Sequence, residues 1–405
     1  MISMEKKSKK QKITEKAVEI ALVSTSHALS SAFRTDKIFL KLMWLSLFIF
    51  GTSFGVYTVI QTIKTYLNYE IVTNIQVINE IPTAFPAVTF YFLKNSKFSL
   101  LNNSILMCSF NRIRCNSNDF YLNQDNQGFT SFTFKNQTSY LGGSSYGLNL
   151  KLNLENIPIN TRSYSSDSDG LRIIIHNSSY DPTYYGGDAT NGFNVAPGFN
   201  HLISIKRTFS YKLGEPYNNC LKDVKSIDSY DSDLFRYIIQ STNYSYRQTD
   251  CFNYCMGREL YKSINISNKI DHFSNVFAKS GSNISTLIQT YLRLLKKGIT
   301  SICGNDCPLE CDSIEYETSL SFNKFLTNKS DNLVNFNLFY SSLDYTMIDQ
   351  IGKMDGFDLI SNIGGNLGLF IGISFLSFAE IIEILIEVLI FLINKNKIFT
   401  SKTNL

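Results

Sequence analysis

Three acidic residues interrupt an apolar segment near the end of the chain, and their spacing indicates cation chemistry. Glu380, Glu383 and Glu387 lie three and four residues apart, which places them on one face of a helix, within about 60° at 100° per residue. A lone carboxylate deep in lipid costs roughly 2.5–3.5 kcal/mol, so the three should face water or protein. In a homo-oligomer such a stripe becomes rings of negative charge that attract cations and repel anions.

Small residues precede these acids in the same segment. Gly364, Gly368 and Gly372 recur every four residues, with Gly365 and Ser374 beside them. Small residues let helices approach closely or expose backbone carbonyls to a pore. A plain anchor helix, with glycine packing and its glutamates at the cytosolic interface, is the simpler alternative for this pattern.

Two apolar segments could carry these residues through a membrane. Residues 359–379 hold no charge over 21 residues, and the apolar character continues to residue 393. A helix over all of 359–393 would be about 50 Å long against a hydrocarbon core of about 30 Å, so it must tilt, break or leave the bilayer. The other segment, 42–63, is uncharged and begins too late for a signal peptide.

Charge, sequons and cysteines indicate one orientation. Lysines gather before residue 17 and again after residue 394, so the positive-inside rule places both termini in the cytosol. All eight cysteines and seven N-x-S/T sequons lie between the two apolar segments, as expected of an extracellular domain. The sequons are at Asn102, Asn136, Asn177, Asn243, Asn265, Asn283 and Asn328.

These signals divide the chain into five parts. They are a cytosolic N-terminus at 1–41, a transmembrane helix at 42–63, an extracellular domain at 64–356, a pore-lining transmembrane helix at 357–393 and a cytosolic C-terminus at 394–405. The composition, 44% hydrophobic with a net charge of +4, indicates neither a nucleic-acid binder nor a disordered protein. The chain has no nucleotide-binding loop and no Ser-His-Asp arrangement, so we expect neither an enzyme nor a cofactor.

Periodicity gives a coarse reading of the extracellular part. β-branched residues predict a strand at 69–81, and alternation predicts strands at 148–154, 171–175 and 202–209. An amphipathic pattern predicts a helix at 285–297, stopped by Gly298. Cys251 and Cys255 share a helix face. The spacing of Cys303, Cys307 and Cys311 could suggest zinc, but no histidine accompanies it and such clusters belong mainly to reducing compartments, so we expect no metal.

Four motifs together resemble the degenerin / epithelial sodium channel / acid-sensing ion channel family. They are Phe85-Pro86-Ala87-Val88-Thr89, Pro216-Tyr217-x-x-Cys220, Cys307-Pro308-x-x-Cys311, and Gly372-Ile373-Ser374 followed by the glutamate stripe. The resemblance implies an α+β extracellular domain built on a β-sheet palm and stapled by disulfides. It also implies two transmembrane helices per subunit and a trimeric channel.

The resemblance also assigns roles to single residues. It places a break in the helix and the selectivity filter at Gly372, Ile373 and Ser374, the gate at Ser361 and Asn362, and the amiloride position at Gly368. It also places pore carboxylates at Glu380, Glu383 and Glu387, a gating motif at His27 and Ala28, and a wrist contact between Tyr69 and Tyr217. The chain departs from the family pattern at three positions. Ala28 stands in place of glycine, Tyr91 in place of cysteine, and Ile373 in place of a smaller residue.

The family order of cysteines implies a pairing that uses all eight. The pairs are Cys108–Cys115, Cys220–Cys311, Cys251–Cys307 and Cys255–Cys303.

We therefore expect a sodium-permeable, amiloride-sensitive cation channel of the plasma membrane. It would be a homotrimer, or a heterotrimer with related subunits, in contact with membrane lipid. Its extracellular stimulus is not identified by the sequence; protons, a peptide or Ca²⁺ are candidates. The alternatives are a non-conducting receptor or accessory subunit, and an ATP-gated two-span channel.

Overall fold

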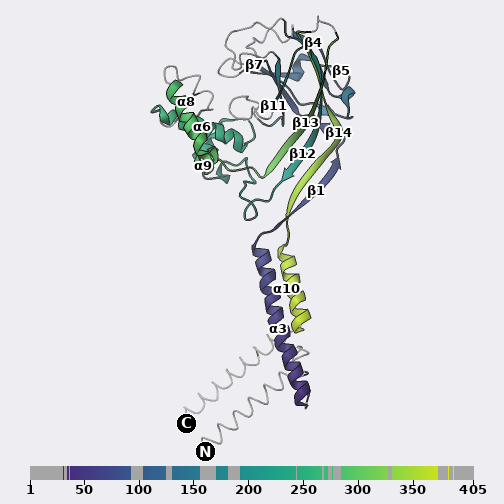
Figure 1. The fold of residues 1–405 in the computed structure, drawn as a ribbon, viewed down its shortest axis with the longest axis vertical. Helices are drawn as coiled ribbons and strands as arrows, with labels where there is room; N and C mark the ends of the chain where they lie inside the picture. Colours follow the sequence, from purple (N-terminus) through teal and green to yellow (C-terminus); the bar gives the residue numbers. More distant parts are fainter. Residues whose placement is uncertain are drawn as a thin grey trace, which may run out of the picture. The chain divides into compact units, whose positions relative to one another are not determined.

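The computed structural model describes most of the chain in two compact units (Figure 1). The described residues are 31, 34–35, 37–92, 104–124, 130–155, 170–180, 192–242, 244–266, 269–271, 276, 284–326, 331–372, 382 and 386. One unit comprises Met1–Val72 with Gly352–Leu405, and the other comprises Thr73–Ile351.

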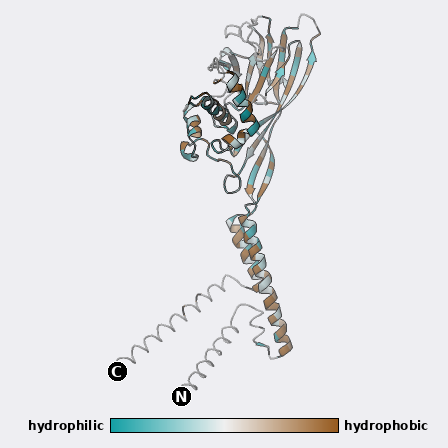
Figure 2. Cartoon of the chain, turned by 60° about the vertical axis from the view of Figure 1, so that its left-hand side comes forward, coloured by the Kyte–Doolittle hydropathy of each residue, from teal (hydrophilic) through white to brown (hydrophobic). Residues whose placement is uncertain are grey.

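Two helices that lie side by side form the described part of the first unit, α3 (Ile38–Leu67) and α10 (Gly356–Ile371). Within the described ranges, α3 is the one helix long and apolar enough to cross a membrane, and most of its side chains are not buried. A core helix of a soluble protein would bury its apolar side chains, so this helix needs lipid or another chain around it. Figure 2 shows the hydrophobic colouring along both helices.

The observed limits of α3 extend four residues beyond the predicted span at each end. The added turns carry Lys41 and Lys64, whose charges can sit at the edges of an apolar layer. The helix ends at Leu67, and the backbone N–H of the capping residue Asn68 donates to the Lys64 carbonyl.

A seven-stranded sheet is the centre of the second unit. The strands run in the order β13 (Asp312–Lys324), β12 (Phe199–Tyr211), β14 (Leu333–Gly352), β9 (Leu148–Asn153), β4 (Ile105–Phe110) and β5 (Ile113–Arg114), with β1 (Ile71–Asn79) also paired to β14. The β12–β14 pair is parallel, whereas β12–β13, β9–β14, β4–β9 and β4–β5 are antiparallel. Three of the predicted strands are confirmed as β1, β9 and β12.

A second, antiparallel sheet packs with the first. It has the order β11 (Gly192–Val195), β10 (Leu171–His176), β3 (Ala87–Phe92), β7 (Thr130–Phe134) and β6 (Phe120–Gln124), and the short strands β2 (Thr83–Ala84) and β8 (Thr138–Ser139) pair beside it. β10 confirms the strand predicted at 171–175. The short 3-10 helices are η2 (Ser117–Asp119), η3 (Ser144–Tyr146) and η5 (Ile227–Ser229).

One hydrophobic cluster joins both sheets, and the FPAVT motif lies inside it. Phe85 and Val88 are buried, and the Phe85 ring centroid lies 4.9 Å from that of Phe110 and 5.6 Å from that of Tyr340. The Tyr340 hydroxyl donates to the Ala84 carbonyl at 2.9 Å. The motif follows β1 in the chain, and its Phe85 contacts β4 through Phe110 and β14 through Tyr340. This packing accounts for the aromatic residue at the start of the motif.

Helices form the remaining part of the second unit. They are α5 (Asp233–Ser241), α6 (Gln248–Ser263), α8 (Ile284–Lys297) and α9 (Ile299–Cys303). The side chain of Ser232 caps α5 by accepting from the Phe235 N–H. α8 confirms the predicted amphipathic helix, and Gly298 follows it with φ +87°, a conformation that favours glycine.

Candidate functional site

Paired carboxylates begin α10, the helix that holds the predicted gate. Asp355 accepts the Asp358 N–H at 2.6 Å, and the Asp358 carboxylate accepts the Asp355 N–H at 3.1 Å. This capping box satisfies two backbone donors, and its negative charge suits the positive end of the helix. The start of α10 is therefore fixed by the sequence itself.

A stripe of small residues follows one face of α10. At 100° per residue, Ser361, Gly365, Gly368 and Gly372 fall within about 60° of one another. The first three are exposed and Gly372 is half-buried. Because an added Cβ at Gly365 would meet nothing within 4 Å, this face is open in the single subunit. Asn362 is exposed next to the stripe.

The opposite side of α10 contacts α3. Asn366 Nδ2 donates to Thr62 Oγ1 at 3.4 Å, and the Phe370 ring lies edge-on to Phe54 with centroids 4.8 Å apart. The small stripe thus points away from the neighbouring helix. Such a face is available for a pore or for another subunit.

α10 ends at the first residue of the predicted filter. Gly372 has φ 77° and ψ 18°, in the left-handed region, and its N–H donates to the Gly368 carbonyl at 3.1 Å. A left-handed glycine is a common helix terminator because it lacks the Cβ that would clash. The resemblance implied a helix break at this tripeptide, and the described helix ends there.

Several predicted site residues lie outside the described residues. They are His27, Ala28, Ile373, Ser374, Glu380, Glu383, Glu387, Asn102, Asn243, Asn283 and Asn328. Their assignments remain predictions. Tyr69, with φ 49°, belongs to the first compact unit and Tyr217 to the second, so their contact also remains a prediction.

The remaining sequons are accessible to different degrees. Asn136 and Asn265 are exposed with positive φ, and Asn177 is half-buried with its side-chain oxygen accepting the Ser179 N–H at 3.0 Å. Asn136 and Asn265 are therefore the better-exposed glycan acceptors of the described part.

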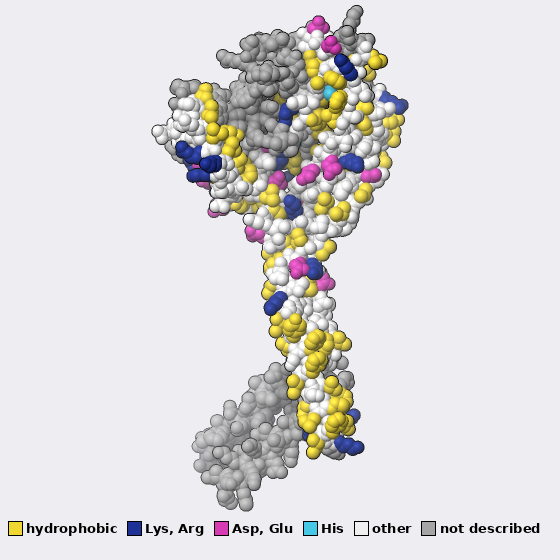
Figure 3. All heavy atoms as spheres, in the orientation of Figure 1, with side chains coloured by type: hydrophobic (Ala, Val, Ile, Leu, Met, Phe, Trp, Pro, Cys, Tyr) yellow, Lys and Arg dark blue, Asp and Glu magenta, His cyan; other side chains and the backbone are white. Residues whose placement is uncertain are grey.

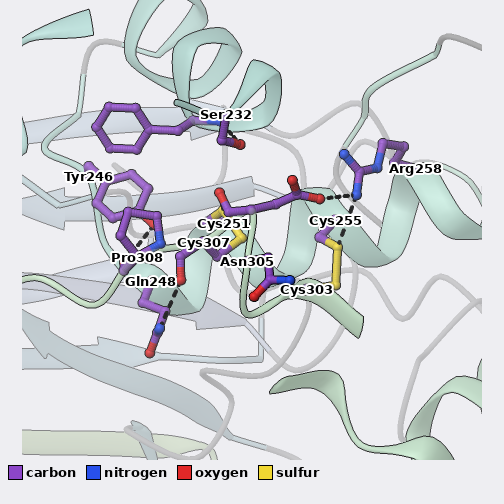
Figure 4. The surroundings of a disulfide bond; sticks show 12 residues. Ser232, Tyr246, Gln248, Cys251, Cys255, Arg258, Cys303, Asn305, Cys307 and Pro308 are labelled. Carbon is purple, nitrogen blue, oxygen red and sulfur yellow. Dashed lines mark hydrogen bonds and ion pairs between the residues drawn. A yellow bond between two sulfur atoms is a disulfide. The ribbon is translucent and has the colours of Figure 1, made fainter. Parts of the chain in front are cut away.

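The four disulfides of the structure are the four pairs that the resemblance implied. Cys251 and Cys255 lie on one face of α6. Cys251 bonds to Cys307, in the turn after α9, and Cys255 bonds to Cys303, the last residue of α9 (Figure 4). Both sulfur pairs are buried. The bridges therefore attach α6 to the short α9 region rather than to the longer α8.

Hydrogen bonds surround these bridges. The Tyr246 hydroxyl donates to the Pro308 carbonyl at 2.8 Å, and Gln248 Nε2 donates to the Cys307 carbonyl at 2.9 Å (Figure 4). Burial raises the pKa of Tyr246, so its hydroxyl stays protonated and remains a donor. No cluster of three or more metal-ligating side chains occurs in the part of the chain that the structure describes.

The structure adds a contact that the sequence analysis missed. The Lys353 N–H donates to the Glu70 carbonyl at 2.8 Å, and the two side chains form an ion pair at 2.5 Å. Glu70 stands between α3 and β1, and Lys353 between β14 and α10. The pair therefore joins the two linkers that lead into the helices. Nothing in the local sequence signals it, because the partners are 283 residues apart.

A family model described as the amiloride-sensitive sodium channel matches residues 21–90 and 91–384. Degenerin deg-1 of Caenorhabditis elegans is 25% identical over 70% of this chain and 39% of its own length, and acid-sensing ion channel 4-B of Danio rerio is 26% identical over 74% and 53%. Acid-sensing ion channel 1A of Danio rerio is 24% identical over 91% of this chain and 87% of its own. This chain thus spans about two fifths of the length of degenerin deg-1 and about half of the length of acid-sensing ion channel 4-B.

One solved structure, of a proton-activated chloride channel, is 9% identical with a TM-score of 0.40, covers 86% of this chain and 100% of that one, and is too distant to support an argument. The family model carries the assignment. Because it spans most of the chain, from residue 21 to residue 384, the chain belongs to the amiloride-sensitive sodium channel family.

Proposed function

We propose that the chain is a subunit of a trimeric, sodium-permeable cation channel of the plasma membrane. The observation that carries the proposal is the small-residue stripe of α10, which faces away from α3 and ends at the left-handed Gly372. Family membership supports the same reading. α3 and α10 would both cross the membrane, with both termini cytosolic.

The proposed pore is built from α10. Around a threefold axis, three copies of the stripe would line a narrow path. The carbonyl of Gly372 and the carbonyl or hydroxyl of Ser374 would replace water around sodium, while the Ile373 side chain points into protein. The glutamates at 380, 383 and 387 would concentrate cations below the filter, and Gly368 would mark the amiloride position.

An accessory subunit that does not conduct is the second candidate. Such a subunit would need only the packing of α3 against α10. The open stripe and the helix end at Gly372 would have no role in it, so these two features favour a conducting channel. An ATP-gated two-span channel is disfavoured because the family model matches most of the chain.

Current recorded from the chain expressed alone tests the proposal. We expect an inward cation current that reverses nearer the sodium than the potassium equilibrium potential, and that amiloride reduces. Gly372→Ala should change the reversal potential because alanine is strained at φ 77°. Gly356→Ala is the matched control, since an added Cβ there meets nothing within 4 Å. An anion current, or no current from protein at the surface, would contradict the proposal.

A thiol introduced at the gate gives a second test. All eight cysteines are paired, so Ser361→Cys would supply the only free thiol. If Ser361 lines the gate, a bulky thiol reagent should hold the pore open and raise the steady current. Ile363→Cys, half-buried on the side of α10 that contacts α3, is the control and should respond little.

A further inference from the structure

Two glycines are the buried residues of α3. Gly51 and Gly55 lie one turn apart on one face, and they alone are classed as buried along the described length of this helix. The hydrophobic side chains along α3 are otherwise exposed to a large extent, which agrees with the predominance of hydrophobic side chains on the visible face of the two helices in Figure 3. Small residues spaced by four let two helices approach closely in a membrane.

Phe370 of α10 occupies the space that these glycines leave. A Cβ added to Gly51 would lie 2.6 Å from the Phe370 carbonyl oxygen, and a Cβ added to Gly55 would lie 3.4 Å from the Phe370 Cβ. Phe54, between the glycines, holds the ring of Phe370 edge-on at 4.8 Å. One turn of α3 therefore contacts both the backbone and the side chain of Phe370.

The contact falls on the last turn of α10, directly before the helix break. Phe370 lies two residues before Gly372. Because the last carbonyls of a helix have no intrahelical partner, the conformation of this turn depends on its surroundings. The approach at Gly51 is to a backbone atom, so no side-chain rotation can relieve a clash there.

We propose that Gly51, supported by Gly55, is a positioning site for the selectivity filter. The inference rests on the proposed function, in which the Gly372 carbonyl meets the ion. Ordinary contacts begin at 3.4 Å, so a methyl group at Gly51 must displace the last turn of α10 by roughly 0.8 Å. That exceeds the tolerance of about 0.5 Å that functional constellations require. Gly51 thus acts on ion selectivity from a helix that need not line the pore.

If Gly51 and Gly55 served only to pack the two helices, their substitution would reduce the amount of channel at the surface, or the total current. It would leave the relative permeability to sodium and potassium unchanged. A positioning role changes the relative permeability of the channels that do reach the surface. Reversal potential measures this property and does not depend on the number of channels.

The test measures reversal potentials under sodium and then potassium in the full-length channel, with surface labelling. Gly51→Ala should cause a severalfold fall in the sodium-to-potassium permeability ratio, and Gly55→Ala a smaller fall, because its contact is already at an ordinary distance. Ser53→Leu is the matched control, since it adds bulk on an exposed position of the same turn. It should leave the ratio unchanged.

A milder variant covers the case in which Gly51→Ala does not reach the surface. Phe54→Leu removes the edge-on ring without adding bulk and should lower the ratio in the same direction. If these variants reach the surface with the wild-type ratio while Gly372→Ala alters it, the positioning site is refuted and the channel proposal stands. If the wild type carries no cation current, or Gly372→Ala has no effect, the proposed function fails and the inference falls with it.

Discussion

Arg207 holds a buried positive charge in β12, with its side chain only 4% exposed. Its Nη2 donates to Glu80 Oε2 at 2.8 Å, and its guanidinium lies 5.2 Å from the ring centroids of Tyr340 and Tyr345. Its Nε has no hydrogen-bond partner in the described part of the chain. Glu80 is thus the acid that neutralises a cation held among aromatic rings.

Removal of the Glu80 charge should destabilise the extracellular domain at neutral pH. Hydrogen bonding from Thr83 and then from Arg207 lowers the pKa of Glu80, against an opposing effect of burial. The stability that this carboxylate contributes is therefore present above its ordinary pKa of 4.5 and is lost as pH falls through the lower folded value. Glu80→Gln should lower the unfolding temperature at pH 7, with a smaller difference in strong acid. Thermal unfolding of solubilised protein at both pH values measures this, and an equal difference at both would contradict it.

His176 is a second buried polar group, and it is buried in its neutral form. Its Nδ1 donates to the Asn177 carbonyl at 2.8 Å, so its Nε2 accepts from the Thr89 hydroxyl at 2.8 Å. The Thr89 oxygen then accepts from the Thr133 hydroxyl at 2.7 Å. Burial lowers the pKa of His176 to about 4, so the imidazole is neutral at pH 7 and the bonds run in this direction.

Mild acid should therefore destabilise the fold through His176. The unfolded histidine takes up a proton below its ordinary pKa of 6.5, whereas the folded one resists until about 4, so stability falls between these values. The full loss is on the order of 3 kcal/mol. His176→Gln should flatten the fall in unfolding temperature between pH 7 and pH 5. Thr89→Val keeps the imidazole and should retain the fall, and an undiminished fall in His176→Gln would refute the assignment.

Among the elements, the disulfide-linked helices allow a comparison between loops of different length. With Cys251–Cys307 intact, the outer bridge Cys220–Cys311 closes a loop of 35 residues, 31 from Cys220 to Cys251 and 4 from Cys307 to Cys311, whereas Cys108–Cys115 closes one of 7 across the β4–β5 hairpin. A cross-link restricts the unfolded chain more when its loop is longer, and the entropic estimate is about 4 kcal/mol for the first and about 2 kcal/mol for the second. The helical region thus depends more on its bridges than the hairpin does.

Replacing each pair by serines should reproduce that order. Cys220→Ser with Cys311→Ser should lower the unfolding temperature more than Cys108→Ser with Cys115→Ser, because the longer loop regains more freedom when unfolded. Differential scanning fluorimetry of the two solubilised proteins provides the comparison. A greater loss for the hairpin pair would show that native contacts, and not chain entropy, set the contribution of these bridges.

The elements also show where sequence reasoning succeeds. Leu148, Leu150 and Leu152 alternate with polar residues and are fully buried, which is why the pattern predicted β9. The twenty residues of β14 gave no comparable signal, because their polar residues interrupt the alternation and the strand gains its partners from distant β12, β9 and β1.

In the candidate site, the features that follow from the order of motifs were predicted, whereas contacts between residues far apart in the sequence were not. The break at Gly372 and all four cysteine pairs followed from a resemblance in motif order. Gly51 looked like an ordinary residue of an apolar segment, because its importance depends on Phe370, 319 residues later. Arg207 gave no signal either, since its burial depends on packing from other strands.

At the scale of the whole molecule, two short linkers connect the sheet strands with the helices. α3 leads through 68–70 into β1, and β14 leads through 353–355 into α10. Because β1 and β14 pair in one sheet, the two linkers leave neighbouring strands. The Glu70–Lys353 pair lies where the linkers meet, so it can influence the relative position of the two helices.

Charge exchange at this pair tests whether the linkers act as one unit in gating. Glu70→Lys or Lys353→Glu alone places like charges together, and should shift the balance between closed and open channels, read as steady current per channel at the surface. An exposed pair contributes only about 0.2–1 kcal/mol, so the shift should be at most about fivefold. The double exchange restores opposite charges and the backbone bond is unaffected, so it should return the current toward the wild-type value. Additive effects of the two single changes would mean that the charges act independently, and that the backbone bond alone joins the linkers.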